Sequence, residues 1–191
     1  TQSGFEICGT PEHPVFTKDE WKRLDELSLD DFVCLKLGTS VAPTKAPAIQ
    51  HTLENFPTKL TADVAKFLGY VIGMGHQLLH SFCEGEAQKI EVKQILSALG
   101  IVKNPKMQML PTAILAAPPN LQKEFIDALK TTSDTSSYSF ASKTFANQLQ
   151  ILLLNHGIFS TVAQAQDQYV LTADFCKIQD GFLYEKIANI K

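Results

Sequence analysis

The stretch that decides the fold reads Ile7-Cys8-Gly9-Thr10-Pro11-Glu12-His13-Pro14-Val15-Phe16-Thr17. Within it, Thr10 and His13 stand three residues apart, bracketed by short apolar runs and a proline. This spacing predicts a hydroxyl and an imidazole at the end of one strand, where the pair could hold and protonate a peptide bond. A Thr-x-x-His tetrapeptide taken alone has a simpler interpretation, which is a turn with a structural histidine.

The residues that follow extend the pattern as far as Val33. They read Trp21-Lys22-Arg23-Leu24-Asp25-Glu26-Leu27-Ser28-Leu29-Asp30-Asp31-Phe32-Val33. Together the two stretches resemble the second sequence block of inteins, the self-splicing elements with a Hint fold. That block has T-x-x-H, then a tryptophan, an E-L pair and G-D-x-V, and Asp30 stands here where the family usually has glycine. The length of the match favours the intein interpretation over a structural histidine.

The resemblance implies roles for two residues in the first step of splicing, the N-to-S or N-to-O acyl shift at the upstream junction. His13 would hold and protonate the scissile amide nitrogen, so that the amine leaves in neutral form. Thr10 would hydrogen-bond the same peptide and help to keep it strained. These two residues are therefore the predicted catalytic pair.

The same resemblance implies that the chain is the middle portion of an intein, for example one piece of a split intein. In the family the first block lies well upstream of T-x-x-H, so Thr1 is not the nucleophile. The terminal His-Asn is also missing, because Asn189 follows no histidine, while Phe182–Lys191 resembles the strand that leads into the closing blocks. We expect single-turnover autocatalytic processing only when complementary N- and C-terminal segments and the flanking exteins are supplied.

Composition sets the broad class. The chain has 191 residues, of which 45% are hydrophobic and 19% charged, with a net charge of −3. This is ordinary for a soluble globule, and the acidic balance argues against a dedicated DNA binder. No apolar run approaches the roughly 20 residues that span a bilayer, so no membrane partner is expected. The four cysteines form no C-x-x-C pair, which predicts a reduced, cytoplasmic setting, with Cys8 and Cys34 as buried small hydrophobes.

The order of predicted elements is β, then α+β, then β. Strands are expected at 5–8, 15–16, 32–37, 158–162, 169–172 and 182–190, and helices after Thr61, across 90–99, after Pro118 and after Ser142. The predicted fold class is α+β, an incomplete all-β Hint-type splicing domain interrupted by a reduced LAGLIDADG-like α+β domain. Its expected parts are 1–37 (Hint, N-terminal part), 38–59 (linker), 60–175 (inserted domain) and 176–191 (Hint, C-terminal part).

The inserted domain is assigned from its first helix. Leu68-Gly69-Tyr70-Val71-Ile72-Gly73-Met74-Gly75 resembles the first signature helix of the LAGLIDADG homing endonucleases, which commonly interrupt inteins. Gly69 and Gly73, four residues apart, would let two such helices pack closely. The second signature would be Phe125–Asp134. A buried amphipathic helix that ends at Gly75, without any DNA function, accounts for the first motif equally well.

The departures from this family predict a degenerate endonuclease. Each signature helix should end in an acidic residue that helps to hold catalytic metal ions. Met74 occupies the first acidic position and Ser133 the second, and Asp134, one residue later, is the possible substitute. We therefore expect no metal and no cofactor, and the pair His76 and His80 has no third ligand nearby in the sequence.

An alternative function of a different class is a DNA-binding domain derived from such an endonuclease, with or without residual nuclease activity. It would need a basic surface that faces phosphates. The candidate residues are few, namely Lys103, Lys106, Lys123 and Lys130. Their sparseness favours the intein interpretation. That interpretation also predicts that residues 4–37 and 178–191 lie together in one β domain, away from the helices of 60–175.

Overall fold

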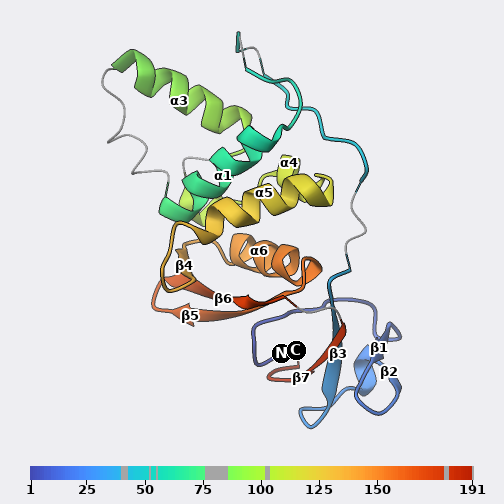
Figure 1. The fold of residues 1–191 in the computed structure, drawn as a ribbon. Helices are drawn as coiled ribbons and strands as arrows, with labels where there is room; N and C mark the ends of the chain where they lie inside the picture. Colours follow the sequence, from blue (N-terminus) through green and yellow to red (C-terminus); the bar gives the residue numbers. More distant parts are fainter. Residues whose placement is uncertain are drawn as a thin grey trace.

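The computed structural model is a mixed α+β structure, as the sequence predicted, and it describes residues 1–39, 43–51, 53–54, 56–75, 86–101, 104–178 and 181–190. Two parts are visible in Figure 1, a larger helical and sheet-containing part and a smaller β-rich part. We call residues 43–178 the body and residues 1–39 with 181–190 the β unit. No helix among the described residues has the length and apolar character required to cross a membrane.

The body stacks helices on one face of a small sheet. Its described helices are α1 (Ala62–Met74), α3 (Glu86–Ala98), α4 (Thr112–Leu115), α5 (Pro119–Lys130) and α6 (Lys143–Asn155), with a short 3-10 turn at Pro105–Met107. Its strands are β4 (Ser137–Phe140), β5 (Ile158–Ala165) and β6 (Gln168–Ile178), antiparallel in the order β4-β6-β5. Helix α6 covers the sheet, and α5 and α1 lie beyond it (Figure 1).

The predicted helix boundaries follow from side-chain caps. The Thr61 hydroxyl accepts a hydrogen bond from the Val64 amide at 3.3 Å, and the Ser142 hydroxyl accepts one from the Phe145 amide at 3.2 Å. Each bond satisfies an amide that the first helical turn leaves unpaired. Helix α1 ends before Gly75, whose φ of 78° suits glycine.

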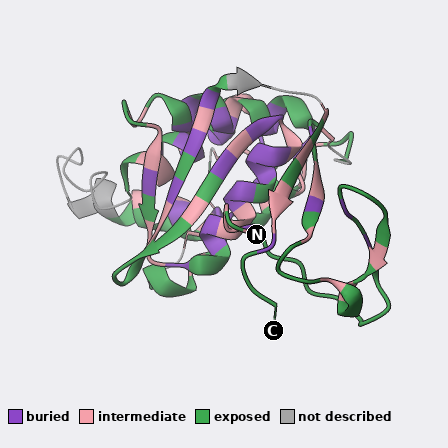
Figure 2. Ribbon diagram, turned by 90° about the horizontal axis from the view of Figure 1, so that it is seen from below, coloured by how far each residue is buried: buried purple, intermediate pink, exposed green. Residues whose placement is uncertain are grey.

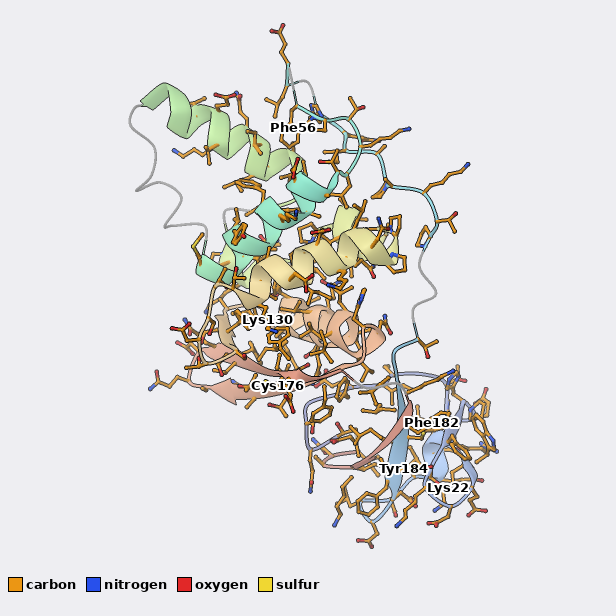
Figure 3. The ribbon with its side chains drawn as sticks, viewed as in Figure 1. Lys22, Phe56, Lys130, Cys176, Phe182 and Tyr184 are labelled. Carbon is orange, nitrogen blue, oxygen red and sulfur yellow. The ribbon has the colours of Figure 1, made fainter. Side chains whose placement is uncertain are left out.

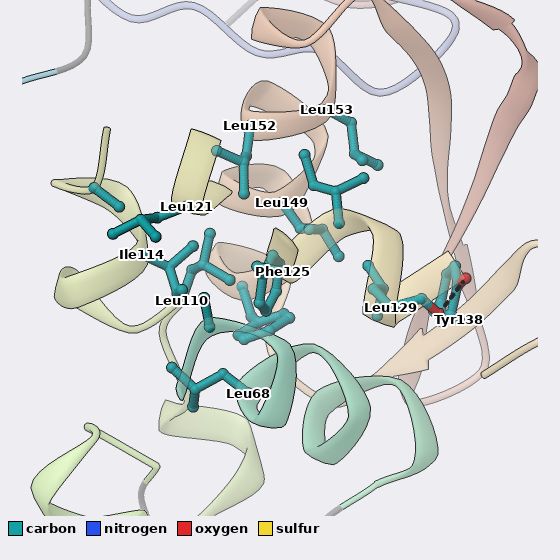
Figure 4. Packing of buried hydrophobic residues seen from close by; sticks show 14 of the residues in the cluster. Leu68, Leu110, Ile114, Leu121, Phe125, Leu129, Tyr138, Leu149, Leu152 and Leu153 are labelled. Atoms are coloured by element: carbon teal, nitrogen blue, oxygen red, sulfur yellow. Dashed lines mark hydrogen bonds between the residues drawn. The ribbon is translucent and has the colours of Figure 1, made fainter. Parts of the chain in front are cut away.

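The main core lies between the helices and the inner face of the sheet (Figure 4). Leu68, Phe125, Leu129, Leu149 and Leu153 are fully buried there. The buried Tyr138 hydroxyl donates to the Leu129 carbonyl at 3.0 Å, and burial raises the pKa of this phenol. The core therefore fixes α5 against both α6 and strand β4.

The β unit joins the two ends of the described chain. Its strands are β1 (Pro14–Phe16), β2 (Trp21–Arg23), β3 (Phe32–Leu37) and β7 (Gly181–Lys186), with a 3-10 turn η1 at Leu24–Glu26. Strands β1 and β2 pair with each other, and β3 pairs antiparallel with β7, Cys34 opposite Tyr184. The expected pairing of the two ends is confirmed. Its buried residues are few, and most of the unit is exposed in Figure 2.

Two expectations about the first residues were wrong. Residues 5–8 form no strand, because Phe5 turns inward instead and is buried against Leu37 and Leu154. The β unit also does not lie away from the helices, since Leu154 belongs to α6 and the Gly38 amide donates to its carbonyl at 3.0 Å. The two parts thus share a small core.

Several smaller expectations also need correction. The expected buried Cys8 is exposed, and Cys34 is only half-buried, with a thiol pKa raised by burial. Ile49, in the stretch expected to be a linker, is buried in the main core and its amide donates to Thr58 at 2.8 Å. At the C-terminal end, strand β7 stops at Lys186, four residues earlier than expected.

Candidate functional site

The Thr10–His13 segment forms a single turn directly before β1. The His13 amide donates to the Thr10 carbonyl at 3.0 Å, which closes the turn. Pro11 occupies its second position, where the ring already has the required φ. The predicted pair is therefore brought together as the first and last residues of one turn, which precedes a strand instead of ending one.

The backbone of this turn is held by its neighbours. The Leu24 amide donates to the His13 carbonyl at 2.8 Å, and the Asp25 amide donates to the Pro11 carbonyl at 3.0 Å. Gly9 lies against His13 so closely that a Cβ at position 9 would be 3.3 Å from the Cβ of His13. A side chain at Gly9 would therefore push on the imidazole.

The side chains of Thr10 and His13 point to the exterior. Both residues are exposed, and neither side chain hydrogen-bonds to another part of the chain that the structure describes. A fixed backbone with two accessible polar groups can present a hydroxyl and an imidazole to a peptide from outside this chain. The geometry is compatible with proton transfer and hydrogen bonding to such a peptide.

Ionic contacts brace the turn from the loop that follows η1. The Lys22 ammonium contacts the Asp31 carboxylate at 2.6 Å, and the same carboxylate accepts the Ser28 amide at 2.7 Å. The hydrogen bond from Lys22, then that from Ser28, lowers the pKa of Asp31, and the same bond to Asp31 raises the pKa of Lys22. The Ile187 amide donates to the Asp31 carbonyl at 3.1 Å, which ties this loop to the end of β7.

The β unit also exposes large apolar side chains. Phe32, Phe182 and Tyr184 lie on one face of the β3–β7 pair, and Phe182 is 64% exposed (Figure 3). Trp21 is 66% exposed and packs only one face against Phe16, with ring centroids 5.1 Å apart. Apolar area gathered on so small a unit is typical of a surface that another segment covers.

A second site candidate lies where α1 and α5 end. The two helices cross at α1 glycines, since a Cβ on Gly69 would lie 2.3 Å from the Phe125 carbonyl oxygen and one on Gly73 would lie 1.9 Å from Oγ1 of Thr132. Met74 and Ser133 are the next residues after Gly73 and Thr132. The structure thus brings the two predicted acidic positions to the same end of one closely packed helix pair.

The chemistry at that end does not suit a hard metal ion. Met74 offers a half-exposed thioether, and the Ser133 hydroxyl donates to the Ser137 carbonyl at 3.2 Å. Asp134 lies in an exposed turn, because α5 ends at Lys130. The described residues contain no group of three or more metal-ligating side chains, and Mg²⁺ requires oxygen ligands of the carboxylate type. The histidines His76 and His80 lie outside the described residues.

The outer face of the body sheet lacks basic side chains among the described residues. It carries Ser, Thr, Ala, Val, Gln, Phe and Cys side chains together with Asp174, as the alternation along β4, β5 and β6 shows. Of the candidate lysines, Lys123 pairs with Asp127, and Lys130 lies over the Phe175 ring at 5.8 Å (Figure 3). Lys106 is exposed on the 3-10 turn, and Lys103 lies outside the described residues.

Two buried polar contacts escaped sequence reasoning. Gln150, 1% exposed, donates to the carbonyls of Ser3 and Ser160, and the His156 ring hydrogen-bonds Gln122 at 2.9 Å. Burial lowers the pKa of His156. The available signal was an amide at a core position of the α6 apolar stripe, although the sequence could not identify its partner.

Comparison with known proteins adds one distant similarity. No family model matches this sequence. An A-type ATP synthase subunit from Pyrococcus horikoshii is 23% identical to it over 215 aligned residues, covering 88% of this chain. The chain spans only 22% of the length of that protein. A similarity at this level assigns no family.

Proposed function

We propose that this chain is the central part of an intein, which takes part in autocatalytic protein splicing once its missing N- and C-terminal segments are supplied. The observation that carries the proposal is the β3–β7 pair, in which strands from before and after the body form one ladder beside the Thr10–His13 turn. A splicing domain interrupted by an insert requires this arrangement. The distant match to a fifth of a longer protein is compatible with an element that interrupts a host.

The exposed apolar face of the β unit supports the need for partners. A β unit of this size buries little more than Val15, Val33 and Ile187 on its own, and it leaves Phe182 and Tyr184 in solvent. We infer that the upstream and downstream segments of the same intein cover this face. Burial of aromatic side chains would then stabilise the completed domain.

In the proposed reaction, the first residue of the upstream segment supplies a thiol or hydroxyl. That group attacks the preceding carbonyl carbon, an ester or thioester bond forms, and the amide C–N bond breaks. His13 in its protonated form gives a proton to the leaving nitrogen, and the proton of the nucleophile passes to solvent. Thr10 hydrogen-bonds the same peptide and holds it in register.

The body is proposed to be a degenerate endonuclease domain of the LAGLIDADG type. The glycine contacts at Gly69 and Gly73 support this ancestry, while Met74 and Ser133 remove the carboxylates that the metal ions would need. The neutral outer face of the sheet offers little attraction to phosphates. We therefore do not extend the proposal to DNA binding.

The experiment that tests the function is reconstitution. The chain would be joined to, or mixed with, the segments that flank it in its gene, with reporter proteins as exteins. We expect the upstream reporter to be released by an added thiol and spliced product to form. A completed and folded protein that neither releases nor splices the reporters would overturn the proposal.

A further inference from the structure

The first residues of the chain are bound to the body and not only to the β unit. We call Ser3–Glu6 the docking segment. The Val162 amide, on the open edge of β5, donates to the Ser3 carbonyl at 2.9 Å, and Gln150 of α6 donates to the same oxygen at 2.8 Å. Glu6 contacts Lys143 at 2.5 Å, also on α6. The body thus holds this segment at both of its ends.

Gln150 is the most buried of these contacts. Its amide group lies inside the body and shares its two N–H donors between Ser3 and Ser160, the second at 3.0 Å. A buried amide without its acceptor is costly, so undocking of Ser3 would leave Gln150 partly unsatisfied. The contact therefore favours the docked position of the segment.

Gly4 shows how closely the segment fits. Its φ is 90°, and a Cβ at this position would lie 2.5 Å from the Val162 carbonyl oxygen. No L-residue other than glycine can take this conformation without strain, and the contact is with backbone, which cannot move aside. Position 4 is thus suited to glycine only while the segment is docked.

The docking segment leads directly into the reactive turn. Three residues separate Glu6 from Thr10, and the last of them, Gly9, packs against His13. The β unit itself holds the other side of the turn through Leu24. The position of the imidazole is consequently determined by the body on one side and by η1 on the other.

We propose that the body positions the Thr10–His13 turn through the docking segment, with Gln150 as the main positioning residue. The inference rests on the proposed splicing function, and it gives the body a role that needs neither metal nor DNA. Displacement of a proton donor by about 1 Å can slow a reaction about 10²-fold. The endonuclease-like body is therefore required for efficient chemistry at the upstream junction.

Two variants loosen the docking segment in different ways. Gly4→Ala acts on the segment itself and leaves the body core untouched, whereas Gln150→Leu keeps the volume on α6 and removes both donated bonds. Ser3→Ala is the control for the first, because the docking contacts of residue 3 are made by its backbone. Gln148→Leu is the control for the second, because Gln148 on the same helix binds the Leu110 amide within the body.

The first measurement is hydrogen exchange on the chain alone, without any splicing partner. We expect the Val162 amide to exchange about 10–100-fold faster in Gly4→Ala and Gln150→Leu than in either control, while amides inside α5 keep their protection. Unchanged exchange at Val162 in both variants would show that the segment is not docked as described, and the proposal would fail.

The second measurement is cleavage in the reconstituted protein. Thiol-induced release at the upstream junction should slow about 10–100-fold in both docking variants and remain normal in both controls. Release at the downstream junction should not change, which separates positioning from general loss of structure. If both variants undock but cleave upstream at the wild-type rate, the positioning role is wrong and the splicing function stands. If wild-type protein does not cleave at all, both proposals fall.

Discussion

Gly73 of α1 and Thr132, just past the end of α5, are in such close contact that a Cβ on Gly73 would lie 1.9 Å from Oγ1 of Thr132. The same crossing places Gly69 against the backbone of α5 at Phe125 and Leu129. The packing of these helices thus depends on the absence of side chains at two positions four residues apart. This contact is the most direct target for a test of the body.

Alanine at either glycine should destabilise the body. Gly69→Ala meets a backbone carbonyl that cannot rotate away, so we expect a loss of about 1–3 kcal/mol in the free energy of unfolding, measured in urea. Gly73→Ala meets the Thr132 side chain, and Thr132→Ala should recover part of its cost. A Gly69→Ala variant as stable as the wild type would contradict the close crossing.

The His156–Gln122 contact predicts a pH dependence of stability. The Gln122 amide donates to the Ile114 and Leu115 carbonyls, so its oxygen accepts from the His156 Nε2–H. Burial first, and the Lys123 charge second, lower the pKa of this histidine, against a smaller opposing effect of Asp127. The unfolded chain therefore binds a proton at higher pH than the folded chain does. Stability is fully present above about pH 6.5, the unfolded value, and declines as the pH falls toward the folded pKa.

The measurement is urea unfolding at a series of pH values from 7.5 to below 5.5. His156→Gln should lower stability at neutral pH and also make its decline over this range less steep, because the titrating group is gone. Equal slopes for the variant and the wild type would show that His156 does not contribute to the acid sensitivity.

The residues at the ends of α1 and α5 predict an inactive nuclease. With Met74 and Ser133 in place of carboxylates, purified protein should not cleave or nick duplex DNA in Mg²⁺ or Mn²⁺. Supercoiled plasmid is a sensitive substrate, and a variant with Asp134→Asn is the matched control. Sequence-specific, metal-dependent nicking that Asp134→Asn abolishes would show that this carboxylate has taken over the role.

His13 and Thr10 should differ in their effects on upstream cleavage. In the reconstituted protein, His13→Ala should slow thiol-induced release by about 10²–10⁴-fold, because the proton donor is removed. Thr10→Ala should cost less, since it removes one hydrogen bond and leaves the donor in place. Association of the segments must be measured in parallel. Normal association with wild-type cleavage in His13→Ala would mean that the histidine is structural.

The sequence predicted the local elements better than their contacts. Caps at Thr61 and Ser142 and the apolar stripe of α6 are local signals, and the helices begin where these signals place them. The β3–β7 pairing was also expected, although only through a family resemblance. Strand order and partners elsewhere depend on contacts between distant residues, which periodicity does not encode.

The candidate site shows the same division. The turn between Thr10 and His13 could be identified from spacing, because Pro11 and the i to i+3 distance are local features. Phe5 was assigned to a strand because apolar residues surround it, but its burial depends on Leu154, far along the chain. The role of Gln150 was invisible for the same reason, since its acceptor Ser3 lies at the opposite end of the sequence.

The antiparallel ladder of β3 and β7 also bears on the order in which the chain folds. Its strands flank the whole body in sequence, so closing that loop in an unfolded chain costs more entropy than any local contact does. Once α6 is formed, the bond from Gly38 to Leu154 anchors the end of β3 close to where β6 leaves the sheet. The ladder can then form at small further entropic cost, after the body and on it. Truncations such as Tyr184→Ala should accordingly speed unfolding and leave the folding rate almost unchanged. The body serves as the template on which the reactive turn is assembled.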